Sequence, residues 1–282
     1  MEYYYPEVIP NVSTCKSPHQ MQGAITKSYF AKAHNLDPKD IFVVSIMPCT
    51  AKKYEKSRKE MEVDGVRDVD AVLTTREVAK MIKRCGINWS KLPEDEDWDQ
   101  DLLGQYSGAG VIFGVTGGVM EAALRTAYFC LTGKEHEKID FEAVRGLAGV
   151  REASIDINGT TLRVAIASGM KNAKVLLDEV KAGKSPYAFI EIMGCPGGCI
   201  NGGGQPYVKP MFLPNEDDDI LETYRQKRAS VLYAEDVNQK VRQSHNNPDI
   251  KKIYADFLGK PLSELSEKLL PPANSLCGFC RG

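Results

Sequence analysis

The sequence predicts an α/β protein with mostly parallel sheets flanked by helices. Two observations support this fold class. Short apolar runs, such as 41–46 and 189–192, alternate along the chain with longer segments that carry helix-start and helix-stop residues. The 282 residues are 43% hydrophobic and 26% charged, which is ordinary for a globular protein with a sizeable core. Strands that alternate with helices in this way usually form parallel sheets covered by helices.

The expected elements follow in chain order. The first helix should begin after Ser17, a good N-cap, with Pro18 in the first helical position and Gln20 completing a capping box, and should run to about Asn35. Strands are expected at 41–46, 69–73, 110–115, 162–167 and 189–192. Further helices are expected from Thr75 to a stop at Gly86, from Gly118 to near Gly133, and from Asn172 to Ala182.

The last part of the chain has a different pattern. The stretch 206–219 lacks periodicity and contains three prolines and an acidic run, so we expect a connecting loop. Residues 222–270 indicate helices only, with breaks near 245–248 and at 259–261. We interpret this region as a helical appendage to the α/β core.

Charge and hydropathy exclude several function classes. The 36 basic and 38 acidic residues leave a net charge of −2, which argues against a general affinity for nucleic acid. No apolar run approaches the roughly 18–20 residues that a membrane helix needs. The first residues show neither a basic leader nor a long apolar segment, so a cytoplasmic location is expected. Because stable disulfides are rare in that compartment, closely spaced cysteines there usually bind metal or carry redox chemistry.

The segment 191–206 carries the most specific pattern. Cys195 and Cys199 are separated by three residues, and five glycines follow Cys195 within nine positions. A glycine-rich backbone exposes amide N–H groups that stabilise cluster sulfides, thiolates or anions. The structural alternative is a loop with two small buried cysteines.

A second cysteine has a similar setting. Residues 44–49 and 190–195 both form an apolar run that ends in Ile-Met-x-Cys, and Lys52 lies three residues after Cys49. Ligands of open α/β sheets bind at the carboxyl ends of strands, so the two strand ends are candidates for one site. Three thiolates, those of Cys49, Cys195 and Cys199, could ligate iron or zinc. A fourth ligand is not evident, and Cys15 is the nearest candidate in character.

Three motifs together resemble the catalytic domain of [FeFe]-hydrogenases. They are Met-Pro-Cys-x-x-Lys at 47–52, the glycine-rich stretch 107–122, and Glu-x-Met-x-Cys-x-x-Gly-Cys-x-x-Gly-Gly-Gly-Gln-Pro at 191–206. The resemblance runs from about Tyr5 to Leu270. It implies two intertwined lobes, one of them incomplete. It also implies a large-subunit catalytic core at 1–214, a small-subunit-like helical segment at 222–270, and a tail at 271–282 that contains Cys277 and Cys280.

The resemblance also implies a cofactor, the H-cluster. This is a [4Fe–4S] cubane joined through a cysteine sulfur to a di-iron subcluster with CO, cyanide and dithiolate ligands. By motif, Cys49, Cys195 and Cys199 would hold the cubane, and Cys199 would bridge to the di-iron unit. Lys52 would donate a hydrogen bond to a cyanide ligand, which is a charge-assisted contact.

Further residues match the family by position. Met47 and Met193 would pack beside the di-iron unit, Ser13 matches a serine on the proton path, and Glu55 is the acidic member of the Met-Pro-Cys motif. The remaining residues expected against the cofactor are Ser17, Pro18, His19, Gly114 and Gly203. The implied reaction is the reversible reduction of protons to H₂ with a ferredoxin-type electron donor, and hydrogenase maturation proteins are implied partners.

The sequence departs from the family in one motif. The family's Thr-Ser-Cys-Cys-Pro motif, which supplies a cubane ligand and a proton-transfer cysteine, is absent from these 282 residues. Three explanations are open, in this order: a truncated gene product, a split enzyme completed by a second chain, or a divergent protein that uses Cys15 instead.

Two other functions share these motifs. One is an iron–sulfur carrier or scaffold of the hydrogenase-like type, and the other is a sensory module, which His19 supports because the family leads us to expect a glutamine there. Lys52, the Gly-Gln-Pro ending and the helical segment favour the hydrogenase. Cys277 and Cys280 suggest either a disordered tail or half a ligand set, and Cys85 and Cys130 are expected in the core.

Overall fold

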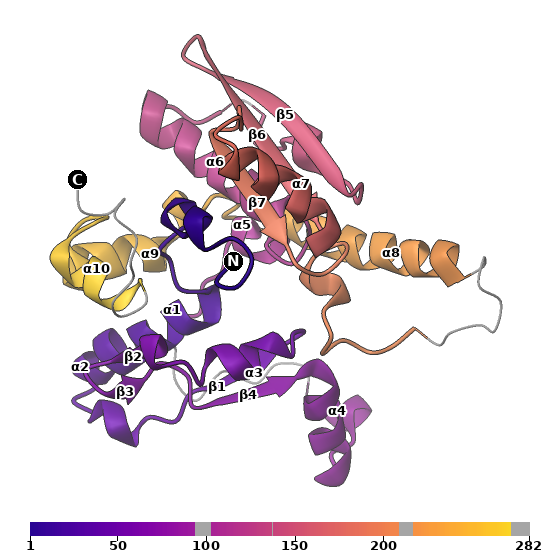
Figure 1. Ribbon diagram of the computed structural model, residues 1–282. Helices are drawn as coiled ribbons and strands as arrows, with labels where there is room; N and C mark the ends of the chain where they lie inside the picture. Colours follow the sequence, from indigo (N-terminus) through magenta and orange to yellow (C-terminus); the bar gives the residue numbers. More distant parts are fainter. Residues whose placement is uncertain (94–102, 137, 209–216, 272–282) are drawn as a thin grey trace. The chain divides into compact units, whose positions relative to one another are not determined.

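The computed structural model of the chain describes residues 1–93, 103–136, 138–208 and 217–271. The chain forms two compact units (Figure 1). Unit 1 consists of Met1–Val8, Gln105–Gly202 and Tyr207–Ile250, and unit 2 consists of Ile9–Gly104, Gly203–Pro206 and Lys251–Gly282. Both units combine helices with small sheets, which confirms the predicted α/β class.

Unit 1 is built on a three-stranded sheet. Its strands are β5 (Val150–Ile157), β6 (Thr160–Ser168) and β7 (Phe189–Met193), in that spatial order. β6 and β7 are parallel, with Val164 opposite Phe189, whereas β5 and β6 form an antiparallel hairpin. The hairpin adds a strand that the sequence analysis did not predict.

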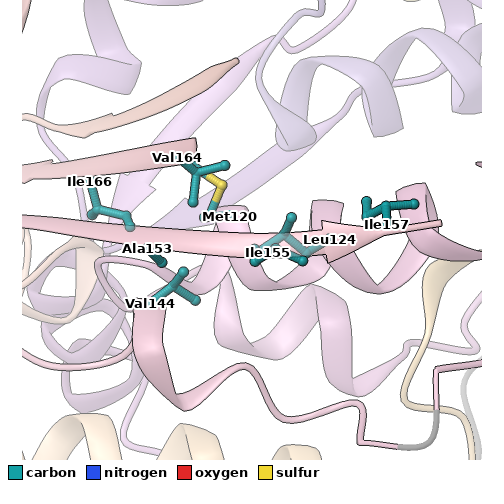
Figure 2. Close-up of a cluster of buried hydrophobic side chains, with 8 residues drawn as sticks. All are labelled: Met120, Leu124, Val144, Ala153, Ile155, Ile157, Val164 and Ile166. Atoms are coloured by element: carbon teal, nitrogen blue, oxygen red, sulfur yellow. The ribbon is translucent and has the colours of Figure 1, made fainter. Parts of the chain in front are cut away.

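Helices cover both faces of this sheet. Met120 and Leu124 of α6 (Gly118–Thr132) pack on Val164 and Ile166 of β6, together with side chains of β5, as Figure 2 shows. The alternate residues of β6, Ala165 and Ala167, pack on α7 (Met170–Lys181). Because successive strand residues point to opposite faces, one apolar strand serves two cores.

One predicted strand is wrong. The run 110–115 lies within and just after helix α5 (Gly108–Ile112). Ser107 caps this helix, since its hydroxyl accepts a hydrogen bond from the Gly110 N–H at 3.3 Å. A short apolar run does not by itself distinguish a strand from a buried helix.

Helix α8 (Asp217–Asn238) belongs to the core of unit 1 rather than to an appendage. Ala229 is buried in one cluster with Val115 and Ile200, and Leu232 and Tyr233 pack against that cluster. The predicted loop at 206–219 lies mostly outside the described residues, and its last three residues form the start of α8.

Unit 2 contains a parallel pair of strands, β1 (Val44–Met47) and β4 (Ala71–Thr74), with Val44 opposite Ala71. Helix α3 (Ala51–Glu55) follows β1, and α4 (Thr75–Arg84) follows β4. A short antiparallel pair, β2 (Glu62–Val63) and β3 (Val66–Arg67), lies between them in the chain. A capping box starts α4: the Thr74 hydroxyl accepts from the Glu77 N–H, and the Glu77 carboxylate accepts from the Thr74 N–H.

The remaining helices of unit 2 pack around its first helix. Helix α1 (Pro18–Ile25) continues through a π-helical turn (Thr26–Phe30) into α2 (Ala31–Ala33). Helix α9 (Pro248–Ile253), whose last three residues belong to unit 2, continues through a second π-helical turn (Tyr254–Leu258), and α10 (Glu264–Leu269) follows. Ile25, Ile253, Leu258 and Leu269 form their common core. Short 3₁₀ turns lie at Pro6–Asn11, Pro38–Asp40, Lys59–Met61, Trp89–Lys91, Glu142–Val144, Cys199–Asn201 and Ser244–Asn246.

Two further expectations concern the surface. Cys85 and Cys130 are exposed, so the prediction that they lie in the core is wrong. Cys277 and Cys280 lie outside the described residues. Among the described helices, none is both long and apolar enough to cross a membrane.

Candidate metal centre

Cys49 lies at the carboxyl end of β1, where the sequence predicts it. Met47 is the last residue of the strand, and helix α3 begins two residues after Cys49, at Ala51. The Cys49 and Met47 side chains are both half-buried. A thiol at the end of a parallel strand is well placed for a ligand.

The glycine-rich ending of the third motif packs on this strand end within unit 2. The Gly204 N–H donates to the Pro48 carbonyl at 2.9 Å, and a Cβ on Gly204 would lie 2.8 Å from the Pro48 carbonyl carbon. Arg76 holds the segment from α4: its guanidinium donates to the carbonyls of Gly203 at 2.9 Å and Gln205 at 2.8 Å. Only glycine allows the backbone at position 204 to approach the Met-Pro-Cys turn this closely.

Lys52, Glu55 and His19 form a hydrogen-bonded group beside this turn. The Lys52 ammonium donates to Glu55 Oε2 at 2.7 Å, across one turn of α3. His19 Nε2 lies 3.0 Å from the same Oε2, and His19 Nδ1 lies 3.0 Å from the Ser45 hydroxyl on β1. Three elements, α1, β1 and α3, therefore meet at the imidazole.

The Glu55 carboxyl is held in its ionised form. Burial raises the pKa of this carboxyl, but hydrogen bonds from His19 and Lys52 outweigh burial and bring the pKa down to about 2. Glu55 is therefore a carboxylate throughout the neutral range, and it can only accept hydrogen bonds there.

The predicted residues that precede α1 are less enclosed. Ser13 and Cys15 are exposed, and the Ser13 hydroxyl accepts from the Cys15 N–H at 3.3 Å. Ser17 occupies the N-cap position and Pro18 the first helical position, as predicted. The Ser17 side chain makes no capping hydrogen bond, so the predicted capping box with Gln20 is wrong.

Unit 1 carries the other two cysteines of the predicted ligand set. Met193 ends β7, and the half-buried Cys195 and Cys199 follow it. Gly198 has a φ of +99°, and a Cβ there would lie 2.7 Å from the Thr116 nitrogen. The Ile200 N–H donates to the Gly114 carbonyl at 3.0 Å, so the segment from Gly194 to Ile200, which we name the cysteine loop, is tied to the predicted Gly114 position.

Glu191 anchors the strand that leads into the cysteine loop. Its buried carboxylate accepts from the N–H groups of Gly117 at 2.6 Å and Met120 at 2.7 Å, at the start of α6. Burial raises the pKa of Glu191 despite these hydrogen bonds. A carboxylate at a helix N-terminus satisfies amides that have no partner within the helix.

Helix α8 also supports the cysteine loop, which sequence reasoning missed. The Arg228 guanidinium donates to the Ile200 carbonyl at 2.8 Å, one residue after Cys199. A Cβ on Gly114 would lie 2.6 Å from a Leu232 methyl carbon of the same helix. These contacts join segments that are far apart in the sequence, and no local pattern predicts them.

The predicted ligand set is thus divided between the two units. Unit 2 brings together Met47, Cys49, Lys52, Glu55, His19 and Gly203, and unit 1 brings together Met193, Cys195, Cys199 and Gly114. Within the described ranges, no group of three or more His, Cys, Asp or Glu side chains is placed to hold a metal ion. The donor chemistry nevertheless fits an iron–sulfur group, because one half-buried thiol in unit 2 (Cys49) and two in unit 1 (Cys195 and Cys199) follow strand ends that glycine-rich segments contact.

Comparisons with known proteins agree with this chemistry. The periplasmic [Fe] hydrogenase large subunit of Nitratidesulfovibrio vulgaris is 56% identical over 223 residues, which are 79% of this chain and 52% of that protein. The cytosolic Fe-S cluster assembly factor narfl of Xenopus tropicalis is 35% identical over 230 residues, 78% of this chain and 48% of that protein. The chain spans about half the length of the curated relatives it matches.

A solved structure and two family models complete the comparison. The apo [FeFe]-hydrogenase HydA1 from Chlamydomonas reinhardtii, in a variant form, matches with a TM-score of 0.77 and 40% identity, over 95% of this chain and 71% of that chain. A family model for the iron hydrogenase small subunit matches residues 222–270. The model for the iron only hydrogenase large subunit, C-terminal domain, matches residues 1–203. The chain therefore belongs to the iron-only, or [FeFe], hydrogenase family.

Proposed function

We propose that this chain is the catalytic portion of an [FeFe]-hydrogenase, which interconverts two protons and two electrons with H₂. The observation that supports this most is the Lys52 ammonium, held by Glu55 and three residues from the Cys49 thiol. A cation three residues from a thiolate ligand suits an anionic ligand on a metal group, and a simple iron–sulfur carrier has no need of one.

The thiols of Cys49, Cys195 and Cys199 are the residues that would hold the cofactor, with Cys199 as the bridge. When bound, the [4Fe–4S] cubane and its di-iron subcluster, with CO, cyanide and dithiolate ligands, supply the redox and hydrogen chemistry. The protein's contribution is orientation, shielding and proton delivery.

The other predicted residues have positions that suit these tasks. Lys52 would donate to an anionic ligand, and Glu55 keeps its ammonium in place. Met47 and Met193 end their strands half-buried, where polarizable side chains would shield a metal group from water. The exposed Ser13 would pass protons from solvent. The residues proposed to line the cofactor are Ser17, Pro18, His19, Gly114 and Gly203.

The proposed partners follow from the function. They are a ferredoxin or similar electron carrier, the hydrogenase maturation proteins, and a second polypeptide as one source of the fourth cubane ligand. The segment at 222–270 acts as a small subunit fused to the large-subunit core. The cytoplasm stays a prediction, because one relative is named as periplasmic.

The alternative function is an iron–sulfur carrier or scaffold. It is supported by the 35% identity with an Fe-S cluster assembly factor over 78% of the chain. A scaffold needs the thiols but has no use for a lysine aimed at an anionic ligand, so the two functions differ in their predicted cofactor.

Anaerobic infrared spectroscopy after co-expression with hydrogenase maturation proteins tests the proposal. We expect CO and cyanide stretches, together with H₂ turnover, either for the chain alone or after a segment with the Thr-Ser-Cys-Cys-Pro motif is supplied in trans. Cys85→Ser, at an exposed cysteine, is the matched control and should keep the signals. Iron–sulfur absorption without any CO or cyanide stretch in both preparations would overturn the hydrogenase and favour the scaffold.

A further inference from the structure

His19 is enclosed by polar groups from two neighbouring elements. Its side chain is only 4% exposed, and both ring nitrogens have partners: Ser45 Oγ on β1 and Glu55 Oε2 on α3, each at 3.0 Å. A buried imidazole with two satisfied nitrogens has a fixed ring orientation. The motif residues alone do not account for this arrangement, because His19 lies 36 residues from Glu55 in the sequence.

The Glu55 partner indicates which ring nitrogen of His19 carries a proton. Glu55 is a carboxylate at neutral pH and only accepts, so His19 Nε2 carries a proton and donates it. At Nδ1 the partner is the Ser45 hydroxyl, which can donate to the ring or accept from it. Ser45 is itself buried, so its hydroxyl has little access to competing water.

Glu55 Oε2 is shared by two donors. His19 reaches it from α1, and the Lys52 ammonium reaches it from within α3 at 2.7 Å. A glutamate side chain has three rotatable bonds, and a lysine side chain has four. From outside α3, the imidazole supplies a hydrogen bond at 3.0 Å to the carboxylate that Lys52 follows, and the Ser17 side chain at the start of α1 also interacts with this carboxyl.

We infer that His19 is a positioning residue for Lys52: the imidazole fixes the Glu55 carboxylate, and that carboxylate fixes the ammonium group. The inference rests on the proposed function in one respect only, that the ammonium points at an anionic ligand of the bound metal group. The hydrogen-bonded chain itself belongs to the polypeptide and can be tested without metal.

The first test measures the reactivity of the Lys52 amine in the metal-free chain. An amine-reactive ester labels the protein, and peptide mapping by mass spectrometry gives the rate at Lys52 relative to Lys53, which pairs with Glu77 instead. We expect His19→Leu to raise the Lys52 rate about threefold, in line with the modest strength of a partly exposed ion pair. His19→Gln should restore most of the protection, because an amide can donate to Glu55 and accept from Ser45.

Two further variants keep this test decisive. His34→Leu makes the same replacement at an exposed histidine after α2, and it should leave the Lys52 rate unchanged. Glu55→Gln removes the charged acceptor itself, so it should raise the labelling rate of Lys52 whether or not His19 positions the carboxylate. If Glu55→Gln raises the Lys52 rate and His19→Leu does not, His19 has no positioning role and the inference is overturned.

The second test uses the loaded enzyme. In His19→Leu we expect the cyanide stretch to shift or broaden, and in His19→Gln we expect it to return toward the parent frequency. An unchanged cyanide stretch in His19→Leu, in a preparation that shows the stretch, would contradict the inference. If no preparation shows the stretch, the proposed function fails. The labelling result still tests the role of His19, because it does not depend on the cofactor.

Discussion

At the scale of single residues, the Glu55 carboxyl makes the stability of the folded chain depend on pH. Its pKa is lowered from 4.5 to about 2, so it contributes stability above pH 4.5 and loses that contribution as pH falls through about 2. At about 1.4 kcal/mol for each pKa unit, the contribution at neutral pH is at most about 3.5 kcal/mol, since solvent screens this partly exposed carboxyl. Glu55→Gln should therefore lower the free energy of unfolding near neutral pH, and the difference from the parent should shrink toward about pH 2.

Urea unfolding of Glu55→Gln and the parent, at several pH values between neutral pH and about pH 2, measures the difference in their free energies of unfolding. Glu142→Gln, at an exposed glutamate of a 3₁₀ turn, is the control and should follow the parent throughout. A constant difference between Glu55→Gln and the parent across the acid range would show that Glu55 stabilises by packing rather than by charge.

Cys199 is the second residue with a specific expectation. As the proposed bridge, Cys199→Ser should abolish the CO and cyanide stretches while part of the cubane iron remains, because a serine hydroxyl is a poor ligand for iron–sulfur groups. Infrared spectroscopy and iron analysis of the same sample measure both. Cys130→Ser, at an exposed position on α6, controls for loss of a thiol elsewhere. Retained diatomic stretches in Cys199→Ser would remove its bridging role.

At the scale of elements, a buried ionic cluster fastens α8 to α6. The fully buried Asp236 accepts from both terminal nitrogens of Arg125, at 2.8 and 2.9 Å, and from Arg242 at 2.6 Å. Burial raises the pKa of Asp236, but the two arginines outweigh burial and lower it. Arg125 also donates to Glu121 at 2.7 Å, so its guanidinium has a carboxylate on each side.

Removing one partner of this cluster should be costly. Asp236→Ala leaves the Arg125 charge buried without its bidentate acceptor, and we expect a loss of about 3–5 kcal/mol in the free energy of unfolding. Glu235→Ala is the control, because that carboxylate bonds the exposed Tyr106 hydroxyl, and it should cost less than about 1 kcal/mol. Equal losses in urea unfolding would mean that the cluster does not hold α8.

The elements also show what the sequence predicts and what it does not. Strand β7 and the helix bounds near Gly86 and Gly133 follow from local apolar and stop signals. Strand β5 was missed although its residues alternate in burial and Asn158-Gly159 follows it, which is a strong hairpin signal. The predicted strand at 110–115 is wrong. Its apolar run has no alternation that would distinguish a strand from a helix, and the Ser107 N-cap favours a helix.

The sequence likewise predicts only part of the candidate site. Cys49, Lys52 and Glu55 lie within one motif, so spacing alone indicates that they share a turn. The contacts from His19 to Glu55 and from Arg228 to Ile200 join distant segments, and only the packed chain reveals them. Local sequence specifies strand ends and caps, whereas tertiary packing decides which side chains meet there.

At the scale of the whole molecule, unit 2 leaves apolar surface uncovered. Phe42, Val44 and Ile46 alternate on one face of β1 and its approach, and they are 71%, 47% and 56% exposed. No side chain of α4 is fully buried, although Val78, Met81 and Ile82 lie at helical spacing. Several exposed apolar side chains on one face of a strand usually mark a region that another segment or partner covers.

The chain should therefore bind the apolar dye ANS while fully folded. We expect the double variant Val44→Thr, Ile46→Thr to reduce the ANS signal by roughly half, because it removes two of the three alternating apolar side chains. Val175→Thr, at a single exposed valine on α7, should change the signal little. Equal signals from all three proteins would show that this face attracts no apolar ligand.

The Arg125–Asp236 contact has a consequence for how the molecule is assembled. The segment 222–270 matches a family model described as a small subunit, yet α8 and α6 here belong to one polypeptide. Helix α8 therefore docks on α6 in an intramolecular step. For short linkers, the effective concentration of one tethered element near the other is about millimolar. Dilution cannot separate the two helices, and a weakened contact would show itself as local opening that amide exchange detects, not as dissociation.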